Sequence, residues 1–145
     1  VDYAHTPDAL DNVLSTLKEL RQGNQRIITV IGCGGDRDKG KRSQMALIAA
    51  SESDYSILTS DNPRTEDPQA ILHDMEQGLD AVLKRKAITM ADRAEAIKLA
   101  CQQARPGDLI LVAGKGHETT QNIQGIKHNF DDVQHLKNNL QSIHG

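Results

Sequence analysis

The feature that most constrains the fold is a repeated order of elements: a short apolar run, then a polar loop, then an amphipathic helical pattern. The apolar runs lie at residues 26–31, 55–58, 86–90 and 108–113. Continuous runs rich in Ile, Leu and Val are typical of strands buried on both faces of a sheet, and the segments between them are long enough for parallel crossovers. The sequence therefore predicts an α/β fold, a Rossmann-like three-layer domain with a mostly parallel sheet. Residues 121–130, with Gly125 in the middle, predict a small C-terminal hairpin.

Helix boundaries follow from capping chemistry. Thr6 and Pro7 predict a first helix whose apolar stripe continues to Leu20 and which ends at Gly23. Pro68 opens a second pattern, in which one stripe contains Ile71, Leu72, Met75, Leu79 and Val82. Asp92 with Glu95 predicts a capping box, and Asp131 or Asp132 predicts the cap of a last helix.

Composition limits the classes of function. The 145 residues fit a single domain spanning 1–145, and a net charge of -3 argues against nucleic-acid or membrane-surface binding. The two cysteines, Cys33 and Cys101, lie far apart without a CxxC partner, which predicts no zinc knuckle or disulfide and fits a reducing cytoplasm. The six histidines show no metal-ligand spacing, so we expect no metal site in this chain.

Three polar loops follow predicted strands, at Gly32–Arg42, Thr59–Asp67 and Gly114–Thr119. The carboxyl ends of parallel strands share one edge of a sheet, so we expect these loops to line one pocket. The second loop combines an acid, an amide, a stiffening proline and a planar cation in Asp61, Asn62, Pro63 and Arg64.

A Gly-rich loop resembling a phosphate-binding loop lies in the first of these segments. Residues 35–41 match most of the GxxxxGK pattern, but Arg42 stands where a hydroxyl should hold Mg²⁺. We therefore reject a self-contained ATP-binding loop. Arg37 remains a candidate clamp for a carboxylate or phosphate.

Three motifs, in this order along the chain, carry a family resemblance: Asp2-Tyr3-Ala4-His5-Thr6-Pro7, Asp61-Asn62-Pro63-Arg64 and Gly114-Lys115-Gly116-His117-Glu118. They resemble the C-terminal domain of the Mur ligases over essentially the whole chain. The first motif is shared with folylpolyglutamate synthases and indicates the superfamily. The second is similar to the motif of those members that add meso-diaminopimelate during peptidoglycan synthesis.

The resemblance implies roles for these residues. Arg64 would pair with the distal carboxylate of meso-diaminopimelate, assisted by Asn62 beside Pro63, while Arg37 would hold the other carboxylate. Asp61 and Glu118, with the Gly114 carbonyl, would receive the distal ammonium. Asp2, Tyr3 and His5 match a hinge and nucleotide-contacting segment, and Lys115 would lie near phosphates after domain closure.

The resemblance also implies a reaction. ATP, with Mg²⁺, phosphorylates the terminal carboxylate of a UDP-MurNAc dipeptide, and the diaminopimelate amine then displaces phosphate to form an amide. The N-terminal UDP-binding domain and central ATPase domain of such ligases are absent here. We therefore expect no catalytic residue in this fragment, no activity from it alone, and a cytoplasmic location for the complete ligase.

Two alternatives remain open. One is another Mur ligase or a folylpolyglutamate synthase, against which the Asp61–Arg64 motif argues. The other is a stand-alone Rossmann-like module that binds an anion or nucleotide. An amino-acid preference screen separates the first from our interpretation, and the parent reading frame separates the second.

Overall fold

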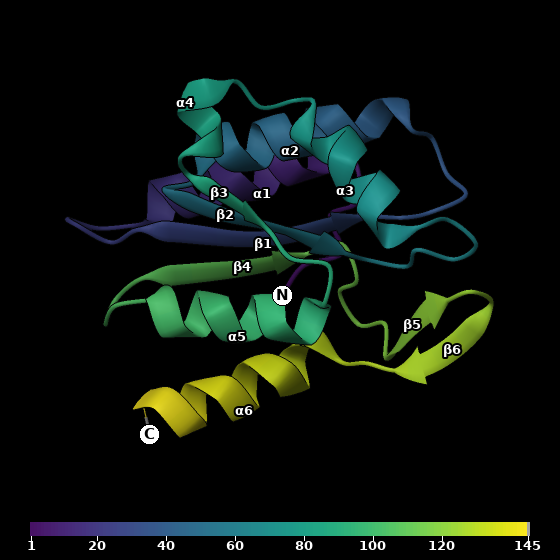
Figure 1. Ribbon diagram of the computed structural model, residues 1–145. Helices are drawn as coiled ribbons and strands as arrows, with labels where there is room; N and C mark the ends of the chain where they lie inside the picture. Colours follow the sequence, from purple (N-terminus) through teal and green to yellow (C-terminus); the bar gives the residue numbers. More distant parts are fainter. Residues whose placement is uncertain (145) are drawn as a thin grey trace.

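A four-stranded parallel sheet in the order β3-β2-β1-β4 forms the centre of the domain, in a computed structural model that describes residues 1–144 (Figure 1). Its strands are β1 (Ile27–Cys33), β2 (Tyr55–Ser60), β3 (Ala87–Thr89) and β4 (Leu109–Ala113). A two-stranded antiparallel sheet follows, formed by β5 (Thr120–Ile123) and β6 (Ile126–Asn129). The helices are α1 (Pro7–Leu20), α2 (Gly40–Glu52), α3 (Pro68–Glu76), α4 (Ala81–Lys84), α5 (Arg93–Gln103) and α6 (Asp132–His144).

Helices cover both faces of the sheet, as Figure 1 shows: α1 to α4 lie on one face, while α5 and then α6 lie on the other. The strands supply both cores by alternation. In β1, Ile27 and Ile31 pack toward α1 and α2, whereas Ile28 and Val30 pack toward α5. All seven residues of β1 are buried, as expected for a strand covered on both faces. The three-layer α/β fold predicted from the sequence is confirmed.

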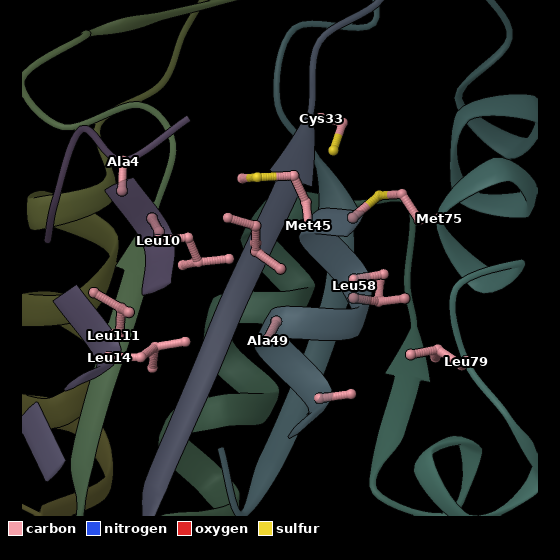
Figure 2. Close-up of a cluster of buried hydrophobic side chains, with 14 of the residues drawn as sticks. Ala4, Leu10, Leu14, Cys33, Met45, Ala49, Leu58, Met75, Leu79 and Leu111 are labelled. Atoms are coloured by element: carbon pink, nitrogen blue, oxygen red, sulfur yellow. The ribbon is translucent and has the colours of Figure 1, made fainter. Parts of the chain in front are cut away.

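The larger core is built from aliphatic and sulfur-containing side chains (Figure 2). Leu10 and Leu14 of α1, Met45 of α2 and Met75 of α3 are all essentially inaccessible to solvent. Methionine is unbranched and adapts to irregular gaps, which suits a core with few aromatic side chains. At one end of this cluster lies Cys33, the last residue of β1. The core thus reaches up to the strand ends, where the polar loops begin.

Two boundary predictions are wrong. The first helix ends at Leu20 with Arg21 as its C-cap, before Gly23, and the Leu20 side chain is 66% exposed. The residues from Ile71 to Val82 do not form one helix: α3 ends before Gly78, where the chain turns, and Val82 lies in α4. Val82 is 64% exposed, so it does not continue the buried stripe. A Cβ on Gly78 would lie 2.1 Å from the Ser43 carbonyl oxygen, so α2 and this turn approach too closely for a continued helix bearing side chains.

The two aspartates before α6 have different roles. Asp131 caps the helix, because its Oδ1 accepts hydrogen bonds from the backbone N–H groups of Val133 and Gln134. Asp132 is fully buried and pairs with Arg93 of α5, at 2.8 and 2.7 Å. Arg93 also donates to the carbonyl oxygens of Ser60 and Ala113, at the ends of β2 and β4. This ion pair therefore joins α5, α6 and two strand ends.

No helix within residues 1–144 combines the length and apolar character that a bilayer crossing needs.

Replacing Arg93 by Met should lower the free energy of unfolding by about 3–5 kcal/mol, because it leaves a buried Asp132 carboxylate without its cation. Urea denaturation of the 145-residue chain measures this. The double variant Arg93→Met/Asp132→Leu should recover part of the loss, since it removes both charges. A single-variant cost below about 1 kcal/mol would contradict this role.

Candidate functional site

The register of the sheet places the three polar loops at one edge. In β1 and β2, Cys33 pairs with Ser60, and in β1 and β4, Ile31 pairs with Ala113. The strand order changes direction at β1, since β2 lies on one side of it and β4 on the other. Ligands of open α/β sheets bind at such a switch point, outside the carboxyl ends of the strands. The hairpin β5–β6 also lies beyond these strand ends (Figure 1).

A cavity of about 340 Å³ opens at this edge, a size suited to a small metabolite. All three loops and the N-terminal segment contribute to its wall, which confirms the predicted convergence. The expected ligand-binding residues on the wall are Arg37, Asp61, Asn62, Arg64, Gly114 and Glu118, together with Tyr3 and His5. Asp2, Pro63 and Lys115 are not on this wall; Pro63 faces a second cavity formed with α5 and the hairpin.

One backbone hydrogen bond and one side chain-to-backbone hydrogen bond join the first two loops. The Gly35 N–H donates to the Asn62 carbonyl at 2.8 Å, and the Arg64 guanidinium donates to the Gly35 carbonyl at 2.9 Å. A Cβ on Gly35 would lie 1.8 Å from the Pro63 carbonyl oxygen, so only glycine permits this approach. The loops therefore form one wall of the cavity as a unit.

Arg64 has a left-handed backbone, with φ of 53°. Such a conformation costs a non-glycine residue about 1–3 kcal/mol and requires support from its surroundings. The hairpin supplies it: the Arg64 N–H donates to the Asn122 carbonyl at 3.0 Å, and the Gln124 N–H donates to the Arg64 carbonyl at 2.7 Å. The direction of the Arg64 side chain is thus fixed by residues about 60 positions away in the sequence.

The two other arginines of the site differ. Arg37 is exposed, and its guanidinium contacts the Asp36 carbonyl at 3.0 Å, so most of its donors face the cavity and solvent. Arg42 is 1% exposed and donates to both carboxylate oxygens of Glu66, to Asp74 and to the Gly34 carbonyl. The position that lacks the magnesium-binding hydroxyl therefore holds a structural cation.

Two buried acidic groups at the strand ends have raised pKa values. Burial is the main cause for Asp61, partly opposed by the charges of Arg93 and Lys115. Asp61 is 9% exposed, and its Oδ1 accepts no hydrogen bond from the described residues. Burial, reinforced by the nearby Asp61 charge, raises the pKa of the Cys33 thiol to about 12. Cys33 is therefore a neutral apolar part of the wall and no nucleophile.

Lys115 lies inside the domain with a fully buried ammonium. It donates to the Thr120 carbonyl at 2.6 Å and to Asn62 Oδ1 at 3.2 Å. Asn62 Oδ1 also accepts from the Asn122 N–H at 2.9 Å, so the NH₂ group of the Asn62 side chain is what remains for a ligand. The phosphate contact expected for Lys115 stays a prediction, and in this arrangement its donors are engaged within the domain.

The N-terminal segment pairs with the edge of β4. The Asp2 N–H donates to the Val112 carbonyl, and the Asp2 carbonyl accepts from the Gly114 N–H, each at 3.0 Å. Tyr3 then lies against Gly116, which has φ of 54°, and a Cβ there would come within 2.9 Å of the Tyr3 Cβ. The Tyr3 and His5 rings stack edge to face at 4.8 Å beside the cavity. Asp2 thus anchors the segment that carries both rings.

The family described as "Mur ligase, glutamate ligase domain" matches residues 1–116 of the 145-residue chain. The chain belongs to this family. Its relatives include two proteins named UDP-N-acetylmuramoyl-L-alanyl-D-glutamate--2,6-diaminopimelate ligase. The one from Cytophaga hutchinsonii is 59% identical over 99% of this chain and 29% of its own length. The one from Bacteroides fragilis is 58% identical over 94% of this chain and 28% of its own length.

Solved structures agree with this Mur ligase assignment. A structure of a protein with the same diaminopimelate ligase name has a TM-score of 0.90 and 49% identity, covering 99% of this chain and 29% of that one. The folylpolyglutamate synthase of Mycobacterium tuberculosis, complexed with ADP and AMPPCP, has a TM-score of 0.57 at 19% identity, over 79% of this chain and 26% of its own. The latter shares the fold alone. The chain spans less than a third of the length of these proteins.

Sequence reasoning missed several residues that build the site of this Mur ligase domain. The hairpin residues Asn122 and Gln124 lie outside the family match and carry no motif, although they hold Asn62 and Arg64. Gln121 likewise donates its side-chain amide to the Asp61 carbonyl at 2.8 Å. Each contact joins residues about 60 positions apart, so no local pattern reveals it. The left-handed backbone of Arg64 could not be predicted from the sequence either, because the residues around it are compatible with an ordinary turn.

The pairing with Arg42 lowers the pKa of Glu66 from 4.5 to about 2. Because the folded-state pKa is the lower one, this ion pair stabilises the fold fully above pH 4.5, and the stabilisation is lost as pH falls toward 2. Glu66→Gln should therefore lower stability at pH 7 by roughly 2 kcal/mol and flatten its pH dependence in that acid range.

Urea denaturation at several pH values measures this effect. Glu19→Gln, on the exposed surface of α1, is the matched control and should change stability by less than about 0.5 kcal/mol. An unchanged acid slope in Glu66→Gln would contradict the role of the Arg42 pair.

Proposed function

We propose that this domain binds the amino-acid substrate of a ligase that joins meso-diaminopimelate to UDP-MurNAc-L-Ala-D-Glu in peptidoglycan biosynthesis. The observation that carries the proposal is the composition of the cavity wall. Arg37 and Arg64 supply planar cations, whereas Asp61 and Glu118 supply carboxylates. Such a wall complements a small molecule with separate carboxylate and ammonium groups. Relatives that share more than half of the sequence carry the corresponding ligase name.

The distal end of diaminopimelate is itself a zwitterion, and the wall offers both charges for it. In our proposal, Arg64 and the Asn62 amide bind the distal carboxylate, while Asp61, Glu118 and the Gly114 carbonyl bind the distal ammonium. Pro63 stiffens the loop between them. Arg37 binds the carboxylate beside the attacking amine. L-lysine lacks the distal carboxylate, so its binding would leave the Arg64 guanidinium without a carboxylate partner, which lowers the affinity for L-lysine.

The chemical step that we propose is the displacement of phosphate from an acyl phosphate of the dipeptide. The free amine of diaminopimelate forms the C–N bond and loses a proton, and the phosphate leaves. This domain contributes by orienting the amine and excluding water, which accelerates the step through positioning. A complete ligase of this kind would act in the cytoplasm, and its central and N-terminal domains would be the partners of this surface.

We assign ATP and Mg²⁺ mainly to those other domains. Within residues 1–144 no group of acidic, His and Cys side chains is suited to hold a metal ion, and Arg42, committed to Glu66 and Asp74, stands where a magnesium-binding hydroxyl would be needed. Tyr3 and His5, held beside the cavity through Asp2, are the residues that we propose to contact the nucleotide. Bound ATP would supply the phosphoryl group.

Two observations weigh against the alternatives. The folylpolyglutamate synthase of Mycobacterium tuberculosis shares the fold at 19% identity, far below the identity of the diaminopimelate ligase relatives. A stand-alone nucleotide module of the GxxxxGK[ST] class would need a hydroxyl after Lys41, and here Arg42 occupies that position in a buried ion pair with Glu66.

Arg64 provides the sharpest test of the proposal. Arg64→Lys keeps the positive charge and the left-handed backbone position but loses the planar guanidinium, which can donate two parallel hydrogen bonds to a carboxylate. The affinity of the variant for meso-diaminopimelate should therefore fall by about 10- to 100-fold, while its affinity for L-lysine stays unchanged. Titrations followed by amide chemical shifts measure both ligands. Arg85→Lys, on the exposed surface away from the cavity, is the matched control and should bind like the wild type. Equal affinity of the wild-type chain for both amino acids would refute the role of Arg64.

The 145-residue chain should bind diaminopimelate without forming an amide, because we assign ATP binding mainly to other domains. Incubating it with ATP, Mg²⁺, diaminopimelate and the UDP-MurNAc dipeptide should release no phosphate above background. A full-length relative is the positive control. Amide formation by this chain alone would contradict the assignment of ATP and Mg²⁺ mainly to other domains.

A further inference from the structure

Lys115 occupies an unusual place for a lysine in a polar loop. Its side chain is completely buried, and it lies behind the cavity wall that its neighbours Gly114 and Glu118 help to form. Its two hydrogen bonds go to the Thr120 carbonyl and to Asn62 Oδ1. A buried ammonium is costly unless it is paired and hydrogen-bonded. The arrangement therefore requires nearby negative charge.

Two carboxylates of the cavity supply that charge. Lys115 Nζ lies 3.6 Å from Asp61 Oδ1 and 3.5 Å from Glu118 Oε1. Both distances are too long for strong hydrogen bonds but close enough for ion pairing. Both carboxylates line the cavity, whereas Lys115 does not. Both residues thus border the cavity on one side, while a cation balances their charge from behind.

We propose that Lys115 is a positioning residue that sets the charge of the cavity, so that Asp61 and Glu118 together accept a single ammonium group. This inference rests on the proposed function and deepens it. Two carboxylates and one internal ammonium leave one net negative charge, which a ligand ammonium neutralises. By holding Asn62 Oδ1, the same lysine also keeps the Asn62 NH₂ group free for a ligand carboxylate.

The charged groups around Asp61 support this assignment. Arg93 faces it from α5 but is committed to Asp132, while Arg64 faces it from the same loop and Glu118 from the β4–β5 loop. Burial and Glu118 raise the pKa of Asp61, whereas Lys115 and Arg93 lower it. Removing the Lys115 charge would therefore raise the pKa of Asp61 further and favour a neutral acid. A neutral carboxyl binds an ammonium more weakly, and its deprotonation would become part of binding.

The first experiment is calorimetric titration of the wild-type chain and of Lys115→Met with meso-diaminopimelate between pH 5.5 and 8.5. The affinity of the wild type should depend less on pH than that of the variant. Lys115→Met should bind about tenfold more weakly at pH 7, should regain affinity as pH rises, and should release protons on binding, which buffers of different ionisation enthalpy reveal. The double variant Lys115→Met/Glu118→Gln restores one net negative charge and should have a flatter pH profile than the single variant.

The outcomes separate the two proposals. If the wild-type chain does not bind diaminopimelate, the proposed function fails and this inference fails with it. If the wild type binds but Lys115→Met has the same pH profile and proton release, this inference alone is overturned. Thermal unfolding of each variant shows whether it is folded.

A second measurement needs no variant and covers the case in which Lys115→Met does not fold. The Lys115 ammonium is buried and hydrogen-bonded, so its N–H groups should exchange slowly and give an NMR signal in the wild-type chain. Diaminopimelate should shift that signal, whereas inorganic phosphate or ATP should not. A shift with phosphate or ATP alone would overturn the inference in favour of a phosphate contact.

Discussion

Parallel pairing of β1 with both β2 and β4 is the constraint on which the other features depend. The registers bring the ends of these strands to one edge, so the loops that follow them, and the charged groups that these loops carry, meet there. Side chains alternate between the two faces of a strand, and a slip of one residue would exchange the core of α1 and α2 with that of α5. The burial of β1 on both faces therefore fixes the place of the cavity as well as the fold.

Three buried cations complete this edge within the described part of the chain. Arg42, Arg93 and Lys115 are each at most 1% exposed, and each combines carboxylate partners with a backbone carbonyl. Strand ends and tight loops leave carbonyl groups without partners in the sheet, and a cation satisfies both these groups and a nearby acid. Lys115 contacts the cavity-lining residues Asp61, Asn62 and Glu118 from behind the wall, while Arg42 and Arg93 join the loops and strand ends around them.

Sequence patterns were sufficient for the elements and for the convergence of the loops. Apolar runs and capping residues are local signals, and parallel topology then brings strand ends together without further information. The helix break near Gly78 was not predictable in this way, because it depends on the approach of Ser43. The hydrogen bonding of Lys115 and the backbone of Arg64 also depend on distant residues, Asn62 and Asn122 respectively. The residues beside them in the sequence carry no signal of either feature.

The support of Arg64 by the hairpin has a consequence for how substitutions far from the cavity can change its wall. The family match ends at residue 116, whereas the groups that fix Arg64 and Asn62 lie at residues 122–124. These contacts come from backbone N–H and C=O groups of the hairpin, so they depend on where the hairpin lies more than on which side chains residues 122 and 124 carry. A substitution that displaces the hairpin would therefore redirect the Arg64 side chain without changing any residue of the cavity wall.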